Sequence, residues 1–257
     1  MTNNSVRDLR DVSIVRVDTP EHKKNYIWHD NAEKIPDSVR FLTTGDIEAY
    51  RNEGVYSFPK GPIDVGAVLM KHPYKKDTFI FVEDANTIDK DRWESIAHIA
   101  ALLGATESHY ILKNCTQTKR TLNVDGTIKY TGVKISAALK KEVEEQLKTV
   151  TKVDEKYAGI LTNETYNQAK TYAKDHNLDT DTQVEKMIML RMPGQKIYKE
   201  KTFTFKSDRL LSREIDAAFS LTILTQTGKF ACNSHFNDSV TTTTEVEVEF
   251  YVKFRVD

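Results

Sequence analysis

The sequence predicts an α+β fold, in which a largely antiparallel sheet is built from N- and C-terminal strands and a helical segment lies between them. Near the start of the chain and again after Gly194, apolar residues alternate with polar ones, which is typical of strands. From about residue 136 to 192 they recur every three or four positions, which is typical of amphipathic helices. The chain ends in "EVEVEFYVKFRVD", whose apolar face needs a buried partner surface.

The first third of the chain predicts three strands and one short helix. The segment "DVSIVRVD" predicts a strand that is buried on at least one side. A loop-rich stretch with several prolines follows, and within it "TGDIEAYRNEG" predicts a short capped helix that ends near Gly54. The runs "IDVGAVLMKHP" and "DTFIFVED" predict two strands, for which a hairpin is the simplest pairing.

The clearest helical pattern covers residues 89–103, with acidic residues at its start and Gly104 as a left-handed stop. Its apolar residues at helical spacing are Trp93, Ile96, Ala100 and Leu103. A strand in "SHYILKNC" follows, and a parallel crossover and an antiparallel return both stay open. Further on, Asp125-Gly126 lies between two alternating runs, which predicts a hairpin turn.

The middle third predicts three helices. The first is "SAALKKEVEEQLKTV", the second begins at Asn163 as its cap, and the third is closed by Pro193-Gly194. The tyrosine and methionine stripe of this region is interpreted as core packing. After it, "KTFTFKSD", "AAFSLTILTQTGKFACNSHF" and the tail predict three or four strands. We expect one domain over residues 1–257, with residues 136–192 as a helical insertion.

Composition and charge favour a folded, water-soluble chain that does not bind nucleic acid. Hydrophobic residues make up 39% and charged residues 29% of the 257 positions, which allows a core inside a solvated surface. The 37 basic and 38 acidic side chains give a net charge of −1, so no global positive field attracts phosphate. The polar N-terminus lacks the apolar core of a secretory signal, and no apolar run has the length of a membrane span. We therefore expect a cytoplasmic protein.

No cofactor or metal site is predicted, because phosphate-binding loops and the common catalytic motifs are missing. The acidic residues before the helix at 89–103 miss the calcium-loop pattern and are interpreted as a helix cap. The candidate catalytic residues are Cys232 and His235, since a thiolate nucleophile needs an imidazole nearby. On a strand these two side chains point to opposite faces, which favours a buried cysteine and a surface histidine.

These observations favour a non-catalytic interaction or assembly module, which binds a protein partner or another copy of itself. Two alternatives stay open. One is a membrane-acting, pore-forming protein that uses Thr-rich amphipathic hairpins, and only under this alternative do we expect contact with a membrane. The other is a hydrolase that depends on Cys232 and His235.

Overall fold

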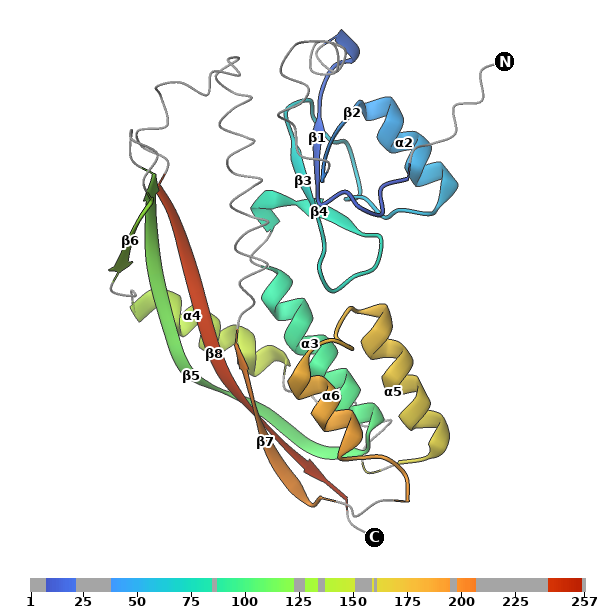
Figure 1. Cartoon of the computed structure of the whole chain (residues 1–257), viewed down its shortest axis with the longest axis vertical. Coiled ribbons are helices and arrows are strands. Elements are labelled where there is room, and N and C mark those ends of the chain that lie inside the picture. Colours follow the sequence, from blue (N-terminus) through green and yellow to red (C-terminus); the bar gives the residue numbers. More distant parts are fainter. Residues whose placement is uncertain are drawn as a thin grey trace. The chain divides into compact units, whose positions relative to one another are not determined.

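The chain divides into two compact units, each with its own sheet (Figure 1). The computed structural model describes residues 8–21, 38–84, 87–122, 128–133, 137–150, 159, 161–194, 198–206 and 240–255. In this part of the chain, residues up to Asp84 belong to the first unit and residues from Thr87 onward to the second. The single domain over residues 1–257 stays a prediction, because compactness does not show whether the two units fold independently.

The first unit contains a mixed four-stranded sheet in the order β2-β1-β3-β4. Its strands are β1 (Ile14–Val17), β2 (Val39–Leu42), β3 (Val68–Lys71) and β4 (Phe79–Phe81). Strand β1 runs parallel to β2 and antiparallel to β3. Strands β3 and β4 pair antiparallel, so the expected hairpin is confirmed. A short 3₁₀ helix, η2 (Val82–Asp84), follows β4.

Both faces of this sheet are buried at β1, because side chains of successive strand residues point to opposite sides. The larger core cluster includes Val15 and Val17, together with Leu69 and Phe79. The smaller one consists of four buried residues: Ile14, Val39, Phe41 and Val68. The strand predicted in "DVSIVRVD" is therefore buried on two sides.

Helix α2 (Thr44–Glu53) has both terminal signals that the sequence predicts. At its start, the Thr43 hydroxyl accepts a hydrogen bond from the Asp46 N–H, and the Asp46 carboxylate accepts one from the Thr43 N–H. This reciprocal pair satisfies two amides that the first helical turn leaves without partners. At its end, Gly54 adopts φ 67°, a conformation that glycine takes without strain.

The second unit contains an antiparallel four-stranded sheet in the order β6-β5-β8-β7. Its strands are β5 (Ala105–Leu122), β6 (Ile128–Val133), β7 (Glu200–Lys206) and β8 (Val240–Phe254). Figure 1 shows β5 and β8 as two long curved strands that lie side by side. The α+β class with a largely antiparallel sheet is confirmed. The C-terminal strand pairs with β5, while the strands before residue 85 form a sheet of their own.

Strand β8 shows why the chain ends in an alternating pattern. Its buried residues are Val246, Val248, Phe250, Val252 and Phe254. The residues between them, such as Glu245 and Glu247, occupy the opposite face. Each buried valine or phenylalanine contributes about 1.5–3 kcal/mol of transfer free energy, so this strand is a main contributor to the core of the second unit.

In the part of the chain that the structure describes, four helices accompany this sheet (Figure 1). They are α3 (Thr87–Leu102), α4 (Ala137–Val150), α5 (Asn163–Asp175) and α6 (Thr182–Met189). Helices α3 and α4 pack against β5, α5 packs against α3, and α6 contacts α5 and β7. The helix expected over residues 89–103 is confirmed within two residues, and Gly104 follows it with φ 81°.

Two details of the second unit differ from the sequence expectations. The cap of α5 is Thr162 and not Asn163, because the Thr162 hydroxyl accepts from the Thr165 N–H and Thr165 returns the bond. The strands before and after α3, β4 and β5, lie in different sheets, so α3 is neither a parallel crossover nor an antiparallel return within one sheet. A helix pattern predicts the helix but not which sheet the next strand enters.

Some expectations lie outside the described residues. Strands β5 and β6 pair antiparallel as expected, but the Asp125-Gly126 turn between them is not described. The strands expected in "AAFSLTILTQTGKFACNSHF" also fall in the range that is not described. None of the described helices combines the length and hydrophobicity that crossing a bilayer requires.

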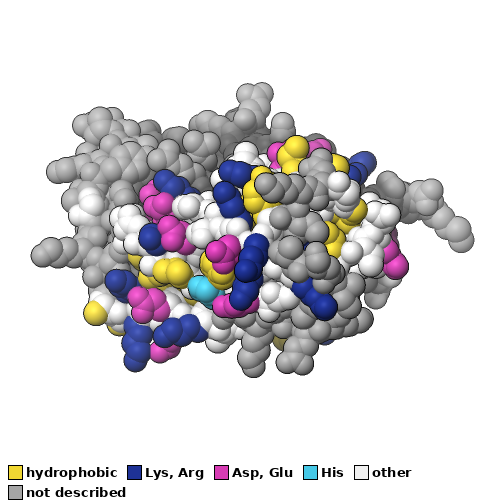
Figure 2. All heavy atoms as spheres, turned by 90° about the horizontal axis from the view of Figure 1, so that it is seen from below, with side chains coloured by type: hydrophobic (Ala, Val, Ile, Leu, Met, Phe, Trp, Pro, Cys, Tyr) yellow, Lys and Arg dark blue, Asp and Glu magenta, His cyan; other side chains and the backbone are white. Residues whose placement is uncertain are grey.

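Acidic and basic side chains alternate on the described part of the face in Figure 2, with hydrophobic side chains exposed between them. Neighbouring charges of opposite sign leave little net field, and dissolved salt screens what remains beyond about one Debye length, roughly 10 Å. This face therefore has the mixed character that the near-zero net charge predicts.

Candidate interaction surface

The candidate catalytic pair, Cys232 and His235, lies outside the described residues, so a hydrolase that uses it stays a prediction. The described cysteine, Cys115, lies on β5 with a free, half-buried thiol. Burial raises the pKa of this thiol, which disfavours the reactive thiolate. Among the described residues, no three His, Cys, Asp or Glu side chains come together in a way that holds a metal ion.

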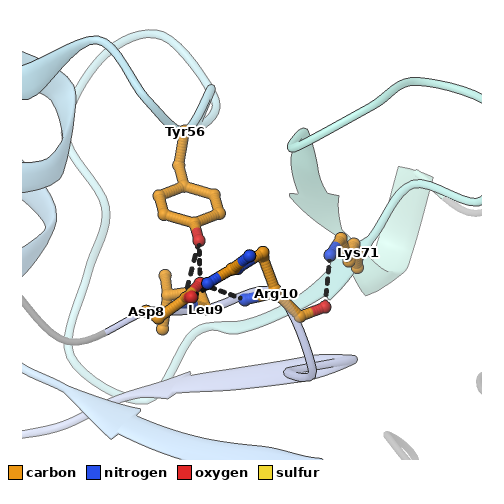
Figure 3. A network of polar contacts seen from close by, with 5 residues as sticks. All are labelled: Asp8, Leu9, Arg10, Tyr56 and Lys71. Atoms are coloured by element: carbon orange, nitrogen blue, oxygen red, sulfur yellow. Dashed lines mark hydrogen bonds and ion pairs between the residues drawn. The ribbon is translucent and has the colours of Figure 1, made fainter. Parts of the chain in front are cut away.

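A polar network in the first unit ties its N-terminal segment to the segment between α2 and β3 and to the end of β3 (Figure 3). The Tyr56 hydroxyl donates to Asp8 Oδ1 at 2.7 Å and accepts from the Leu9 N–H at 2.9 Å. The side chain of Arg10 pairs with Asp8, and Lys71 Nζ donates to the Arg10 carbonyl. The hydrogen bond from Tyr56 is the main reason why the pKa of Asp8 falls to about 2. The network holds three chain segments together.

A second polar group in this unit is buried on β1. The Arg16 side chain is only 9% exposed, and its Nε and Nη1 atoms have no hydrogen-bond partner. A buried guanidinium with unused donors is a candidate for binding an anion. However, Asp18 Oδ2 lies 3.7 Å from Arg16 Nε and already neutralises the charge. The arrangement is therefore a buried ion pair and not an open anion site.

In the second unit, Arg92 joins three elements. From α3, its Nη2 donates to Asp181 Oδ2 at 2.8 Å and its Nη1 donates to the Lys206 carbonyl at 2.6 Å. Asp181 is at the same time the N-cap of α6, since its Oδ1 accepts from the Gln183 and Val184 amides. This buried contact fixes where α6 begins and where β7 ends.

A second arginine fixes the other end of α6. The Nε of Arg191 donates to the Leu103 carbonyl at 3.0 Å, and its guanidinium lies 4.3 Å from the ring centroid of Phe254. Burial lowers the pKa of Arg191, and the side chain is nevertheless placed where a backbone oxygen and an aromatic face receive it. The segment from α6 to β7 is thus anchored on both sides by arginines.

Three large apolar side chains of the segment that Arg92 and Arg191 hold in place are exposed. Met189 is 57%, Met192 42% and Tyr198 44% exposed, whereas Met187 is fully buried. Successive residues of a helix point about 100° apart, so Met187 and Met189 cannot lie on the same face. The interpretation of the methionine stripe as core packing is right for Met187 and wrong for Met189 and Met192. The run "MIML" is the sequence feature from which this exposure follows.

The strand that follows is at the edge of its sheet. In the described part of the chain, β7 pairs with β8 on one side and with no strand on the other. An edge strand presents unpaired N–H and C=O groups, to which another strand can add. The exposed apolar side chains and this edge both occur in the α6–β7 segment, defined as residues 182–194 and 198–206. This segment is the candidate interaction surface.

Comparison with known proteins adds no further information on function. The chain matched none of the protein-family models, curated proteins or solved structures with which it was compared. The interaction surface is therefore inferred from the residues of this chain alone.

Proposed function

We propose that this protein is a non-catalytic interaction or assembly module that binds another protein through the α6–β7 segment. The observation that supports this most is the exposure of Met189, Met192 and Tyr198 within ten positions of each other. Apolar side chains that gather at a surface, surrounded by polar residues, are typical of protein contact sites. The segment is also held in place by Arg92 and Arg191, so little conformational entropy is lost when a partner binds.

The residue types of this surface fit a protein partner. Methionine side chains are flexible and polarisable, so they adapt to the shape of a partner, and tyrosine combines an apolar ring with a hydroxyl group. Both are enriched in protein interfaces. The free thiol of Cys115 agrees with a cytoplasmic location, where thiols are kept reduced, and we include this location in the proposal.

Oxidative footprinting of the methionines tests the proposal. In dilute purified protein, Met189 and Met192 are expected to oxidise to the sulfoxide quickly, while the buried Met70 and Met187 serve as internal references. In concentrated protein or in native lysate, a bound partner is expected to slow oxidation of Met189 and Met192 several-fold. Equal oxidation rates under all three conditions would contradict the proposal.

Two double variants distinguish an effect on this surface from a general effect on folding. Replacing Met189 and Met192 together by serine is expected to abolish the partner-dependent protection of Tyr198. The matched control replaces Val55 and Val65, two exposed apolar residues of the first unit, and is expected to leave that protection unchanged. Loss of protection in both sets would indicate a general effect on folding and would argue against this surface.

A second candidate function, a membrane-acting pore-forming protein, is favoured by the length of β5 and β8. These strands have 18 and 15 residues, which exceeds the ~9–11 residues that a strand needs to cross a bilayer. Their cross-strand pairs near Thr241 to Thr244 belong to the Thr-rich stretch that motivates this alternative. Dye release from liposomes, before and after limited proteolysis, is the test, and intact vesicles in every lipid mixture would exclude it.

A further inference from the structure

The backbone pattern of β7 shows which of its groups are available for a partner strand. The Phe254 N–H donates to the Lys199 carbonyl, and in an antiparallel pair the residues that face the neighbour alternate along the strand. Lys201, Phe203 and Phe205 therefore direct their backbone groups to β8. Glu200, Thr202, Thr204 and Lys206 direct theirs away from it.

One of these outward groups is already used. The Lys206 carbonyl accepts a hydrogen bond from Arg92, so it adds little to an external strand. Its N–H remains directed outward, together with the N–H and C=O groups of Thr202 and Thr204 and the carbonyl of Glu200. The register of β7 with β8 is continuous over all seven residues, without the bulge that commonly protects a sheet edge.

The side chains of β7 are complementary to those of a second, antiparallel β7. The pairing that places Phe203 opposite Phe203 of the other copy brings Glu200 opposite Lys206 and Thr202 opposite Thr204. Opposite charges and threonine pairs across strands are favourable. Lys201 then lies opposite Phe205 of the other copy.

Other registers are less favourable. A shift by one residue places the exposed threonines of one copy opposite the buried phenylalanines of the other. Because side chains alternate between the two faces of a strand, this register would match an exposed face with a buried one. A shift by two keeps the faces matched but leaves the ends of both strands without partners and separates Glu200 from Lys206. The symmetric register is the one that pairs all seven residues, with roughly six hydrogen bonds between the copies.

We propose that the partner of the β7 edge is a second copy of this chain, bound through antiparallel β7–β7 pairing with Phe203 on the two-fold axis. This inference rests on the proposed function and adds the identity of the partner. A two-fold axis makes every contact off the axis occur twice, so the Glu200–Lys206 pair is formed twice in one dimer. The two sheets become one continuous sheet across the axis.

Charge reversal tests the pairing. Glu200→Lys and Lys206→Glu each convert both opposite-charge pairs into like-charge pairs, and each is expected to raise the dimer dissociation constant about tenfold or more. The double variant restores opposite charges and is expected to recover the wild-type value. Sedimentation equilibrium over a concentration series measures the constant. Lys170→Glu and Glu145→Lys, on exposed positions of α5 and α4, are the matched controls.

The two single variants also separate pairing from a local effect. The Glu200 carboxylate accepts a hydrogen bond from the Tyr251 hydroxyl at 2.8 Å, and Glu200→Lys removes it. Lys206→Glu leaves that bond intact. Weaker dimerisation in Glu200→Lys alone, or a double variant that fails to recover, would overturn the proposal. A wild-type chain that stays monomeric at every concentration, or that forms only assemblies larger than a dimer, would overturn it as well.

Disulfide trapping tests the register itself. In a background with Cys115 and Cys232 replaced by serine, a Thr202→Cys copy mixed with a Thr204→Cys copy is expected to cross-link, because directly opposite residues lie about 5.5 Å apart between Cα atoms. Each variant alone is expected to stay uncross-linked. A cross-link in one variant alone indicates a shifted register and would contradict the proposal.

The outcomes also distinguish this inference from the proposed function. If Met189 and Met192 are protected in lysate while charge reversal changes nothing, the surface is an interface for a different protein and the dimer proposal fails. If neither protection nor dimerisation occurs, both fail.

Discussion

A single hydroxyl group, that of Tyr56, sets the acid behaviour of the N-terminal segment in the first unit. It donates to Asp8 and lowers the pKa of that carboxyl to about 2. Because the folded state favours the charged carboxylate, its contribution to stability is complete above the ordinary pKa of 3.8 and is lost as the pH falls toward 2. Asp8 thus stabilises the fold at neutral pH.

Tyr56→Phe is expected to raise the pKa of Asp8 toward 3.8, since it removes the largest cause of the shift. The pairing with Arg10 remains and keeps part of the effect. A pH titration of the Asp8 carboxyl carbon by NMR measures the change. An unchanged pKa in Tyr56→Phe would show that Arg10, and not Tyr56, sets it.

Arg92 is a second residue whose effect is expected to be large. Its replacement by leucine leaves the mostly buried Asp181 carboxylate, which is 15% exposed, without its counter-charge and removes a donor from the Lys206 carbonyl. Breaking a buried ion pair in this way costs about 3 kcal/mol. Urea unfolding measures the loss. Lys90→Ala, which breaks an exposed pair with Glu94 on the same helix, is the control and is expected to cost less than about 0.5 kcal/mol.

For single residues, the sequence predicts burial only where the periodicity of its apolar positions is clear. The alternation of β8 predicts that Val248 and Phe250 are buried, because successive side chains point to opposite faces of a strand and the apolar face packs against the core. In "MIML" four apolar residues follow each other, so that helical geometry exposes at least one of them. Partners such as the Arg92–Asp181 pair are 89 positions apart and depend on the tertiary fold, which no local pattern contains.

Among the elements, helix α2 offers a direct test of a terminal signal. Gly54 ends it with φ 67°, and a Cβ at this position meets no atom within 4 Å. Gly54→Ala is therefore expected to destabilise the first unit by about 1 kcal/mol through backbone strain alone. Gly132 on β6 is the matched control, since its surroundings are equally open and its φ is not positive, and Gly132→Ala is expected to cause no loss. Thermal unfolding of both variants checks this, and equal losses would contradict the role of the left-handed conformation.

The sequence predicts where helices and strands begin and end better than it predicts which strands pair with each other. The sequence predicts a helix over residues 89–103 and α3 spans Thr87–Leu102, because apolar spacing, acidic residues and Gly104 agree. The strand expected around "SHYILKNC" extends to Leu122, since threonine and charged residues are compatible with an exposed strand face. That β8 pairs with β5 and not with β1 depends on long-range packing, which alternation alone does not specify.

For the whole molecule, the main question is whether the two compact units unfold together. Each has its own sheet and its own buried aromatic residues, Phe58 and Phe79 in the first unit and Phe203, Phe205 and Phe250 in the second. In the first unit, Phe58 and Phe79 stack with ring centroids 5.1 Å apart. In the second, Phe250 lies beside Phe205 and Tyr110. A core that is complete within a unit is the physical requirement for independent folding.

Phe250→Ala tests this independence. Removing a fully buried phenylalanine is expected to cost about 4 kcal/mol, through lost apolar contacts and the cavity that remains. Hydrogen exchange is then expected to accelerate in β5, β7 and β8 while the amides of β1 keep their protection. Phe250→Leu, which leaves a smaller cavity, is expected to give the same pattern at a lower cost and serves if the alanine variant does not fold. Equal loss of protection in β1 would instead show that residues 1–257 unfold as one cooperative domain.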